Sequence, residues 1–204
     1  MNDDQIVDVV AGTRSTYGVI ADQYATRWSG SPDWLVGDMD RLAALLPPGA
    51  RVADIGCGPG HHAEMLRERG LRVTGFDLSP QMLAARGVPG LVQADMRALP
   101  LASASHDAVW SAAAMLHVPR PDVPGALAEF GRVLRPGGHL VLIVAEGEGE
   151  RWEEVPYQPD ARRWYVYHRL EDLTGLLEAA GLTVRETARR PGNRNWLHFY
   201  AQRA

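Results

Sequence analysis

Cysteine is almost absent from this 204-residue chain, which carries only Cys57. A single thiol forms no internal disulfide, so the sequence does not indicate the cross-linked framework of a small secreted protein. Residues 1–4 include two aspartates and no basic residue, so they lack the charged and apolar regions of a signal peptide. We therefore expect a cytoplasmic protein in a reducing compartment.

Long apolar runs and lysine are missing as well. No apolar run approaches the roughly 20 residues that cross a membrane. All 21 basic residues are arginine, a bias that indicates a GC-rich genome rather than a function. They stand against 25 acidic residues, and the net charge of −4 offers no basic surface for nucleic acid. We expect neither nucleic acid nor a membrane as a partner.

What the chain does contain is typical of one globular domain with a substantial core, since 46% of its residues are hydrophobic and 23% are charged. Apolar strand-like runs alternate with helical patterns, which predicts an α/β fold with a parallel sheet covered on both faces. The expected strands are residues 51–55, 72–76, 91–94, 107–111 and 138–145, and the expected helices are residues 13–28, 33–46, 61–69, 80–86, 122–134 and 170–180.

Two further apolar segments close the chain, at residues 182–189 and 195–202. Proline, glycine and asparagine at positions 191–193 form a turn signal between them. The pair is therefore expected to be an antiparallel hairpin that completes the sheet.

The most informative segment is residues 52–60, Val-Ala-Asp-Ile-Gly-Cys-Gly-Pro-Gly. It predicts a buried strand, then a glycine loop, then a helix that begins near His61. Such a loop brings backbone amides and a helix N-terminus close to a ligand. A dinucleotide-binding loop would carry its third glycine where His61 stands. Asp54, before the first glycine, would repel a pyrophosphate but accept hydrogen bonds from an ammonium group, directly or through water. The loop therefore suits a nucleoside with an amino-acid tail.

Residues 54–60 fit the pattern D-x-G-x-G-x-G and resemble motif I of the class I S-adenosylmethionine-dependent methyltransferases. The likeness extends from about Tyr17 to the C-terminus. It implies a Rossmann-like, doubly wound, mostly parallel sheet of about seven strands whose last strand is antiparallel. It also implies S-adenosylmethionine as cofactor, S-adenosylhomocysteine as product, and a small-molecule methyl acceptor, in a monomer or homodimer.

Four segments that follow predicted strands supply the candidate cofactor residues. In the loop, backbone at Gly56, Cys57, Gly58 and Gly60 would pack against the methionyl part and the ribose. Asp77, about 20 residues beyond the loop, stands where Rossmann-like folds bind a ribose. Its alternative role is to cap the helix that follows Ser79. The remaining residues that the resemblance implies are Leu78 and Met82 beside the adenine, Asp95 and Met96 at the adenine edge, Ser111 near the methionine chain, and Tyr24 and Arg27 of a lid helix at the methionine carboxylate.

A general base is needed only for some methyl acceptors, and histidine suits that role at neutral pH. His117 is the first candidate and His168 the second. The alternative for His117 is a buried histidine with both ring nitrogens hydrogen-bonded. His61 and His62 are neighbours at the start of a helix and point apart, so we expect no metal site.

Residues 146–168 mix carboxylates with aromatic rings and form the candidate substrate cap. We expect Glu146, Trp152 and Tyr165, together with Tyr17, to contact substrate; a solvated loop with a few core aromatics is the alternative. Within one domain, 1–204, the predicted parts are lid helices at 1–48, a cofactor-binding core at 49–145, the cap at 146–168, and a helix and hairpin at 169–204.

Three functions fit these observations. The first is methyl transfer from S-adenosylmethionine to an oxygen, nitrogen or carbon atom of a small metabolite by in-line displacement. The second is a protein of the same fold that binds the nucleoside without methylating, as a repurposed enzyme or binding protein. The third is an NAD-dependent oxidoreductase.

Overall fold

The computed structural model describes residues 3–27 and 32–204, with side chains from Val9 onward. Residue 28, the expected end of the first helix, lies outside these residues. The helices are α1 Asp3–Arg27, α2 Asp33–Leu45, α3 His61–Glu68, α4 Pro80–Ala84, α5 Val123–Val133 and α6 Leu170–Ala179, with short 3-10 helices η1 Met115–His117 and η2 Arg120–Asp122. The strands are β1 Arg51–Ile55, β2 Arg72–Asp77, β3 Leu91–Gln93, β4 His106–Ala112, β5 Leu134–Ala145, β6 Glu150–Val155, β7 Gln158–Val166, β8 Leu182–Arg190 and β9 Trp196–Arg203.

Seven of the described strands form one sheet in the order β3-β2-β1-β4-β5-β9-β8. Strands β1 to β5 are parallel, while β9 runs antiparallel to both β5 and β8. The predicted parallel sheet, the C-terminal hairpin and its antiparallel last strand are therefore confirmed. The strand order reverses between β1 and β4, which is where open α/β sheets bind their ligands, at the carboxyl ends of the strands.

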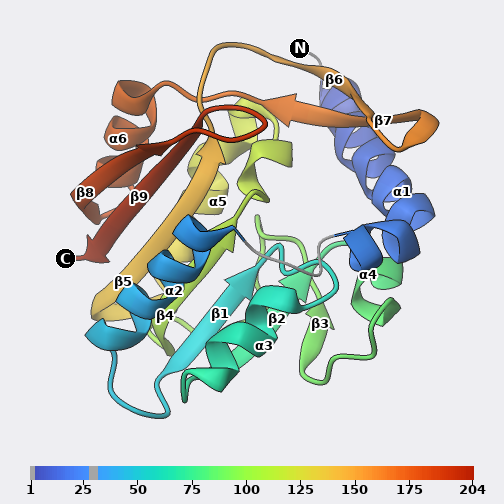
Figure 1. Cartoon of the computed structure of the whole chain (residues 1–204). Coiled ribbons are helices and arrows are strands. Elements are labelled where there is room, and N and C mark those ends of the chain that lie inside the picture. Colours follow the sequence, from blue (N-terminus) through green and yellow to red (C-terminus); the bar gives the residue numbers. More distant parts are fainter. Residues whose placement is uncertain (1–2, 28–31) are drawn as a thin grey trace.

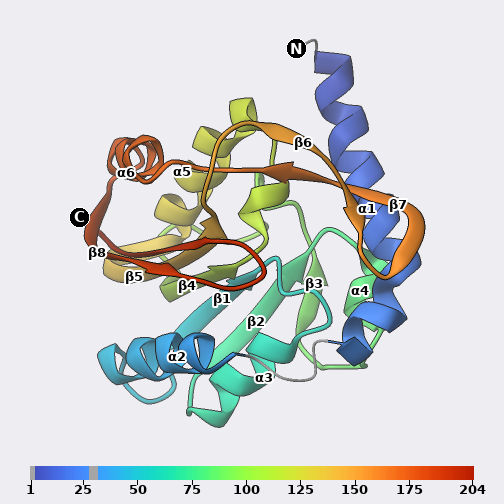
Figure 2. The same cartoon turned by 45° about the horizontal axis from the view of Figure 1, so that its top comes forward.

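Helices cover both faces of the sheet (Figures 1 and 2). This is possible because the strands carry apolar side chains on both faces, and each face has its own buried cluster. In β1, Ala53 and Ile55 belong to the core beneath α5 and α6. Val52 belongs to the core beneath α2 and α3, together with Trp110 of β4. Figure 1 shows α2 and α3 in front of the sheet and α5 behind it. The loop after β1 is thus held between two packed layers.

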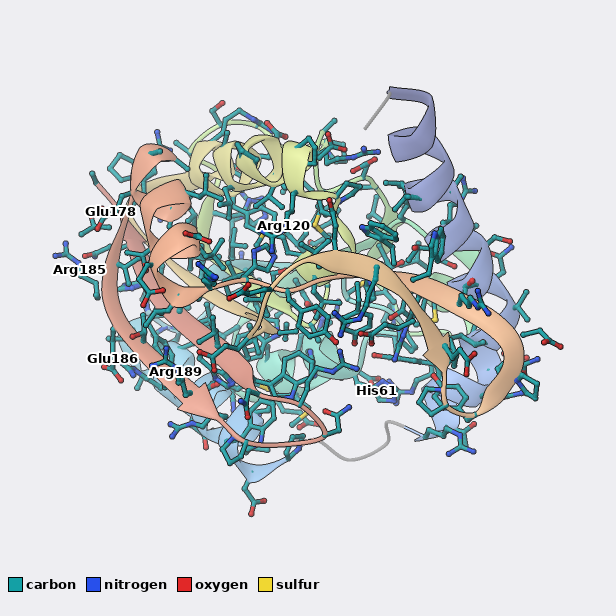
Figure 3. The ribbon with its side chains drawn as sticks, turned by 90° about the horizontal axis from the view of Figure 1, so that it is seen from above. His61, Arg120, Glu178, Arg185, Glu186 and Arg189 are labelled. Atoms are coloured by element: carbon teal, nitrogen blue, oxygen red, sulfur yellow. The ribbon has the colours of Figure 1, made fainter. Side chains whose placement is uncertain are left out.

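Residues 146–168 contain a second sheet that the sequence did not predict. Strands β6 and β7 pair as an antiparallel hairpin, with Trp152 opposite Trp164. A two-stranded hairpin is marginal by itself, and this one packs along α1. Seen from above, it crosses over the carboxyl edge of the main sheet (Figure 3). The expected alternative of a solvated loop is therefore wrong for 150–166.

The first helix begins earlier than predicted, at Asp3 rather than near residue 13. It lies beside the sheet and packs against β7 and α4 (Figures 1 and 2). Among the described residues, no helix has both the length and the apolar character to cross a bilayer.

Candidate functional site

The loop after β1 has a backbone that only glycine accommodates at its first position. Gly56 has a φ of +74°, and a Cβ added there would lie 2.0 Å from the Cβ of Ala114. The amides of Gly56 and Cys57 donate to the carbonyl of Phe76 at 2.7 and 3.0 Å. These bonds tie the loop to β2, so its shape is fixed by the sheet.

Asp77 links the glycine loop to the start of helix α4 through two hydrogen bonds. Its Oδ2 accepts from the amide of Gly58 at 2.9 Å, and its Oδ1 accepts from the amide of Ser79 at 2.8 Å. Helix α4 is capped by the hydroxyl of Ser79, which accepts from the amide of Met82 at 3.3 Å. The cap of α4 is therefore Ser79, and Asp77 instead orients the glycine loop. Burial raises the pKa of Asp77.

Asp54 lies beneath the loop with 1% of its surface exposed. Burial, with the nearby Asp77 carboxyl, raises the pKa of Asp54 to about 8, although the amide of Ala63 donates to it and Arg67 is close. Its Oδ2 has no partner among the described residues and can accept one more hydrogen bond. Asp54 is outside the linings of the cavities described next, so it supports the loop from below.

Two adjoining cavities open at this edge of the sheet. The first is lined by eight of the predicted cofactor residues: Tyr24, Gly56, Gly58, Asp77, Leu78, Met82, Asp95 and Met96. Helix α1 adds Thr13, Arg14 and Tyr17 to this lining. Residues that the sequence predicted from four separate segments therefore meet at one cavity.

The second cavity lies on the other side of the glycine loop. Both linings include Tyr17, Tyr24, Gly56 and Gly58, so the two spaces meet at the loop. Many of the side chains that line the second cavity are aromatic or can donate a hydrogen bond: Cys57, His61, His62, Trp34, Trp196, Tyr165, Arg163 and Asn193. Cys57 is a predicted cofactor residue, and burial raises the pKa of its thiol. Tyr17 and Tyr165 are the predicted substrate residues that the structure brings together.

Besides Asp54, three predicted cofactor residues lie outside both linings. Arg27 is exposed, and its guanidinium lies 4.6 Å from the centre of the Tyr157 ring. Gly60 begins α3, where an added Cβ would meet Leu91 at 3.0 Å. Ser111 is fully buried, and its hydroxyl has no partner among the described residues. For Arg27 this placement disagrees with the expected ligand contact, because the ring of Tyr157 holds it at the surface.

Three other predicted residues also lie outside both linings. His168 is buried where the chain leaves the hairpin, and its amide donates to Ala145 at 3.0 Å. Glu146 forms an ion pair with Arg189 at 2.7 Å. Trp152 stacks edge-on against Trp164 with the ring centres 5.6 Å apart. His168 as a base, and Glu146 and Trp152 as substrate contacts, are therefore corrected to structural roles.

His117 is at the first cavity, and both of its ring nitrogens have partners. Its Nδ1 lies 2.6 Å from the carbonyl oxygen of Trp164, which only accepts, so Nδ1 carries the proton. Its Nε2 then accepts from the hydroxyl of Tyr17 at 2.7 Å. Burial, together with the positive charge of Arg163, lowers the pKa of His117 to about 3. The expected alternative of a satisfied, neutral histidine describes this geometry, and it makes His117 a weak base.

Asp95 forms an ion pair with Arg97. Partial burial alone would raise the pKa of Asp95, but the hydrogen bonds from Arg97 outweigh it and keep that pKa below its usual value. Arg97 Nη2 lies 2.7 Å from Asp95 and Arg97 Nη1 lies 2.5 Å from Asp122. Asp95 is therefore ionised at the cavity wall and can still accept hydrogen bonds.

Sequence reasoning missed Arg163, Trp34 and Trp196, which face the second cavity from three distant segments. Arg163 carried no signal, because β7 itself was not predicted. His62 was assigned no role; its Nδ1 accepts from Trp110 Nε1 at 3.3 Å, and burial lowers its pKa to about 4. Within the described residues, no group of three metal-ligating side chains gathers at one place.

The chain is similar to known proteins in both sequence and fold. Residues 53–142 match the family described as "Methyltransferase domain". The chain is 38% identical over 182 residues to a malonyl-[acyl-carrier protein] O-methyltransferase of Pectobacterium atrosepticum, covering 78% of this chain and 71% of that one. It is also 38% identical over 149 residues to the enzyme of that name from Enterobacter lignolyticus, covering 67% of this chain. The chain spans only 59% of the length of that relative.

One solved structure matches nearly the whole chain. It is the Burkholderia thailandensis 1,6-didemethyltoxoflavin-N1-methyltransferase with bound 1,6-didemethyltoxoflavin and S-adenosylhomocysteine. The TM-score is 0.73 at 24% sequence identity, and the match covers 98% of this chain and 90% of that one. At this identity the likeness is one of fold.

Proposed function

This chain belongs to the class I S-adenosylmethionine-dependent methyltransferases, and from that premise we propose that it methylates a small metabolite at an oxygen, nitrogen or carbon atom. The cofactor would occupy the first cavity and the methyl acceptor the second. With the family established, the dinucleotide alternative loses its support. We further propose one domain, 1–204, in which α1 and the β6–β7 hairpin form the cap over both cavities.

The residues present fit the cofactor. Because Gly58 has no side chain, space stays open at the junction of the two cavities. An added Cβ would fill it, lying 3.2 Å from Met82 Cε and 3.9 Å from the Tyr24 ring. Asp54 Oδ2, buried beneath the loop without a partner in the described chain, would reach an ammonium group only through a water, since Asp54 is outside both cavity linings. We propose that Asp77, Leu78, Met82, Asp95 and Met96 hold the nucleoside, and that Tyr24 and the loop amides hold the amino-acid part.

When bound, the cofactor supplies a methyl group on a sulfonium, ready for displacement by a nucleophile. The protein's own contribution is position and exclusion of water. The loop fixes one side of the junction through its bonds to β2, and Tyr17 and Tyr24 close it from α1. Their rings meet edge to face, with centres 5.9 Å apart. Holding two reactants in line in this way removes several kcal/mol of barrier.

The observation that carries the proposal is the Asp77–Gly58 hydrogen bond at 2.9 Å. It couples the acid after β2 to the glycine loop after β1, so one carboxyl orients two parts of the first cavity. A carboxyl buried at a cavity wall with a raised pKa is typical of a functional site.

Asp77→Ala tests this assignment. It should weaken S-adenosylhomocysteine binding by about tenfold or more, which is about 1.4 kcal/mol, in isothermal titration calorimetry. Asp107→Ala is the matched control, because Asp107 also accepts from a backbone amide, that of Arg51 at 2.7 Å, but at the opposite end of the sheet. Undiminished affinity in Asp77→Ala, or an equal loss in Asp107→Ala, would remove Asp77 from the cofactor site.

A repurposed protein that binds the nucleoside without methylating is the second candidate, and the low pKa of His117 is the observation that favours it. Incubation of the protein with isotope-labelled S-adenosylmethionine and extracts of its source organism separates the two. Mass spectrometry should find a product heavier by one labelled methyl in place of hydrogen. Tight binding without any labelled product would favour the repurposed protein.

We propose a cytoplasmic location and a monomer or homodimer without a nucleic-acid partner. The net charge of −4 supports the last point. Size-exclusion chromatography with light scattering gives the oligomeric state.

A further inference from the structure

Resting on the proposed function, we infer that Arg163 binds an anionic oxygen group of the methyl acceptor, so that the substrate class is a small, flat organic anion. Arg163 is on β7 and lines the second cavity. A guanidinium matches the two oxygens of a carboxylate or a similar anion.

The hydrogen bonds of Arg163 are largely unfilled. A guanidinium has five N–H donors, and within the described residues Arg163 makes one hydrogen bond, from Nη1 to the hydroxyl of Tyr17 at 3.0 Å. Its Nε is buried without a partner, and no described carboxylate lies within 4.0 Å of it. A half-buried charge with free donors that borders a cavity is costly unless a ligand completes it.

Other half-buried arginines without a carboxylate partner are satisfied in a different way. Arg67 donates through Nε and Nη2 to the carbonyl of Val73, at 3.2 and 2.7 Å. Arg120 donates to the carbonyls of Tyr167 and Gly149. Arg163 has no such carbonyl partner among the described residues, so its unfilled donors are a feature of the cavity rather than of arginines in this chain.

The carboxylate paired with Arg163 in the hairpin register is already engaged. Glu153 is opposite Arg163 in the β6–β7 register. It accepts from Arg194 at 3.2 Å and from the hydroxyl of Tyr167. Arg194 is thereby neutralised, although it lies only 4.1 Å from the centre of the Tyr165 ring. Arg163 lines the cavity without a neutralising carboxylate from the part of the chain that the structure describes.

The walls around Arg163 determine the shape of the anion. Trp34, Trp196 and Tyr165 line the same cavity, and Arg163 lies 5.2 Å from the centre of the Tyr165 ring. Aromatic walls favour a flat apolar body through stacking. Arg163 and these aromatic side chains together favour a conjugated or aromatic molecule with one anionic end.

An anionic acceptor also agrees with the proton chemistry of the site. The Tyr17 hydroxyl donates to His117 and accepts from Arg163, so neither ring is poised to take a proton. The pKa of His117, lowered to about 3 by burial and by Arg163, makes it a poor base. A nucleophile that arrives already ionised needs none.

Benzoate and its neutral analogue benzamide are the probes, titrated into the whole protein saturated with S-adenosylhomocysteine and followed by tryptophan fluorescence. Trp34 and Trp196 in the cavity report occupancy. The wild type should bind benzoate about tenfold more tightly than benzamide. Arg163→Gln should abolish this preference, and Arg163→Lys should keep part of it because the charge remains.

Arg27→Gln is the matched control, since Arg27 also stacks on a tyrosine ring without a described carboxylate partner, but outside both cavities. It should leave the preference unchanged. Equal affinity of the wild type for the two probes, no measurable benzoate binding, or a preference that survives in Arg163→Gln would overturn the inference. S-adenosylhomocysteine affinity, measured in every variant, separates this outcome from failure of the proposed function, which would appear as lost cofactor binding in the wild type.

Discussion

At the scale of single residues, the site depends on positions where a side chain is excluded. Gly56 and Gly58 both have positive φ values, of +74° and +54°. At Gly56 the obstacle is also steric, because Ala114 occupies the space where a Cβ would lie. The loop amides can approach a ligand because these two positions carry no side chain.

Gly56→Ala should combine backbone strain with steric overlap and destabilise the protein by about 2–4 kcal/mol. Gly70→Ala is the control, since Gly70 has a φ of +80° but no atom within 4 Å of an added Cβ. That change should cost only about 1 kcal/mol, from strain alone. Urea denaturation gives both values, and equal losses in the two variants would show that the overlap with Ala114 relaxes without cost.

At the scale of elements, hydrogen bonds join α1 and the β6–β7 hairpin into the proposed cap. The amide of Trp164 donates to the hydroxyl of Thr13 at 2.9 Å, and the hydroxyl of Thr16 donates to the carbonyl of Arg162 at 2.5 Å. Trp152 packs against the helix at Gly12, where an added Cβ would lie 2.8 Å from its ring. The helix therefore supplies hydrogen-bond partners for a hairpin that has little support of its own.

Thr13→Val should loosen this cap, because it leaves the amide of Trp164 without its acceptor at a cost of about 1–3 kcal/mol. Hydrogen exchange should quicken together in residues 9–27 and 158–166, while the seven-stranded sheet stays protected. Thr26→Val is the control on the same helix, as the Thr26 hydroxyl donates only to Asp22 at 3.0 Å within α1. Faster exchange in α1 alone would contradict a joint cap.

At the scale of the whole molecule, charged side chains lie along the open edge of the sheet at β8. The outer strand β8 carries Arg185, Glu186 and Arg189, which lie along that edge in Figure 3. Charged edge strands discourage pairing with another chain. Arg41 of α2 reaches Glu186 at 2.6 Å and so ties one helical layer to the edge.

The ionisable interior makes stability depend on pH. Burial lowers the pKa of His62 and His168 to about 4 and, with Arg163 nearby, that of His117 to about 3, against about 6.5 in the unfolded chain. Between about pH 4 and 6.5 these three histidines bind protons only when unfolded, so acidification destabilises the fold. Asp54, whose pKa is raised to about 8, opposes this because it holds a proton in the folded state, and Asp77, whose pKa is also raised, acts in the same direction.

Near pH 5 the three histidines are almost fully protonated in the unfolded chain and outweigh the two aspartates by about one proton. The free energy of unfolding should therefore fall on acidification below about pH 6, by about 1 kcal/mol per pH unit near pH 5. Urea denaturation at these pH values measures it. A stability that is constant or rises on acidification would mean that the histidines are solvated and titrate normally.

The sequence alone determined the layered α/β fold and brought eight of the predicted residues to one cavity. Strands buried on both faces are apolar throughout, and a glycine loop requires its glycines at fixed spacing, so both leave local signals. The acids after successive strands, Asp77 and Asp95, were predictable because parallel strands bring their carboxyl ends to one edge. The β6–β7 hairpin left no such signal, since its charged strands are stabilised by packing on α1.

Only the tertiary structure decided which chemical groups meet. His117 and His168 both looked like bases in the sequence, yet packing directs one to the cavity wall and buries the other behind the hairpin. Arg163 and Tyr17 are 146 positions apart and touch because β7 packs on α1. A contact of that range depends on how two elements are oriented against each other, and no local pattern of residues encodes it.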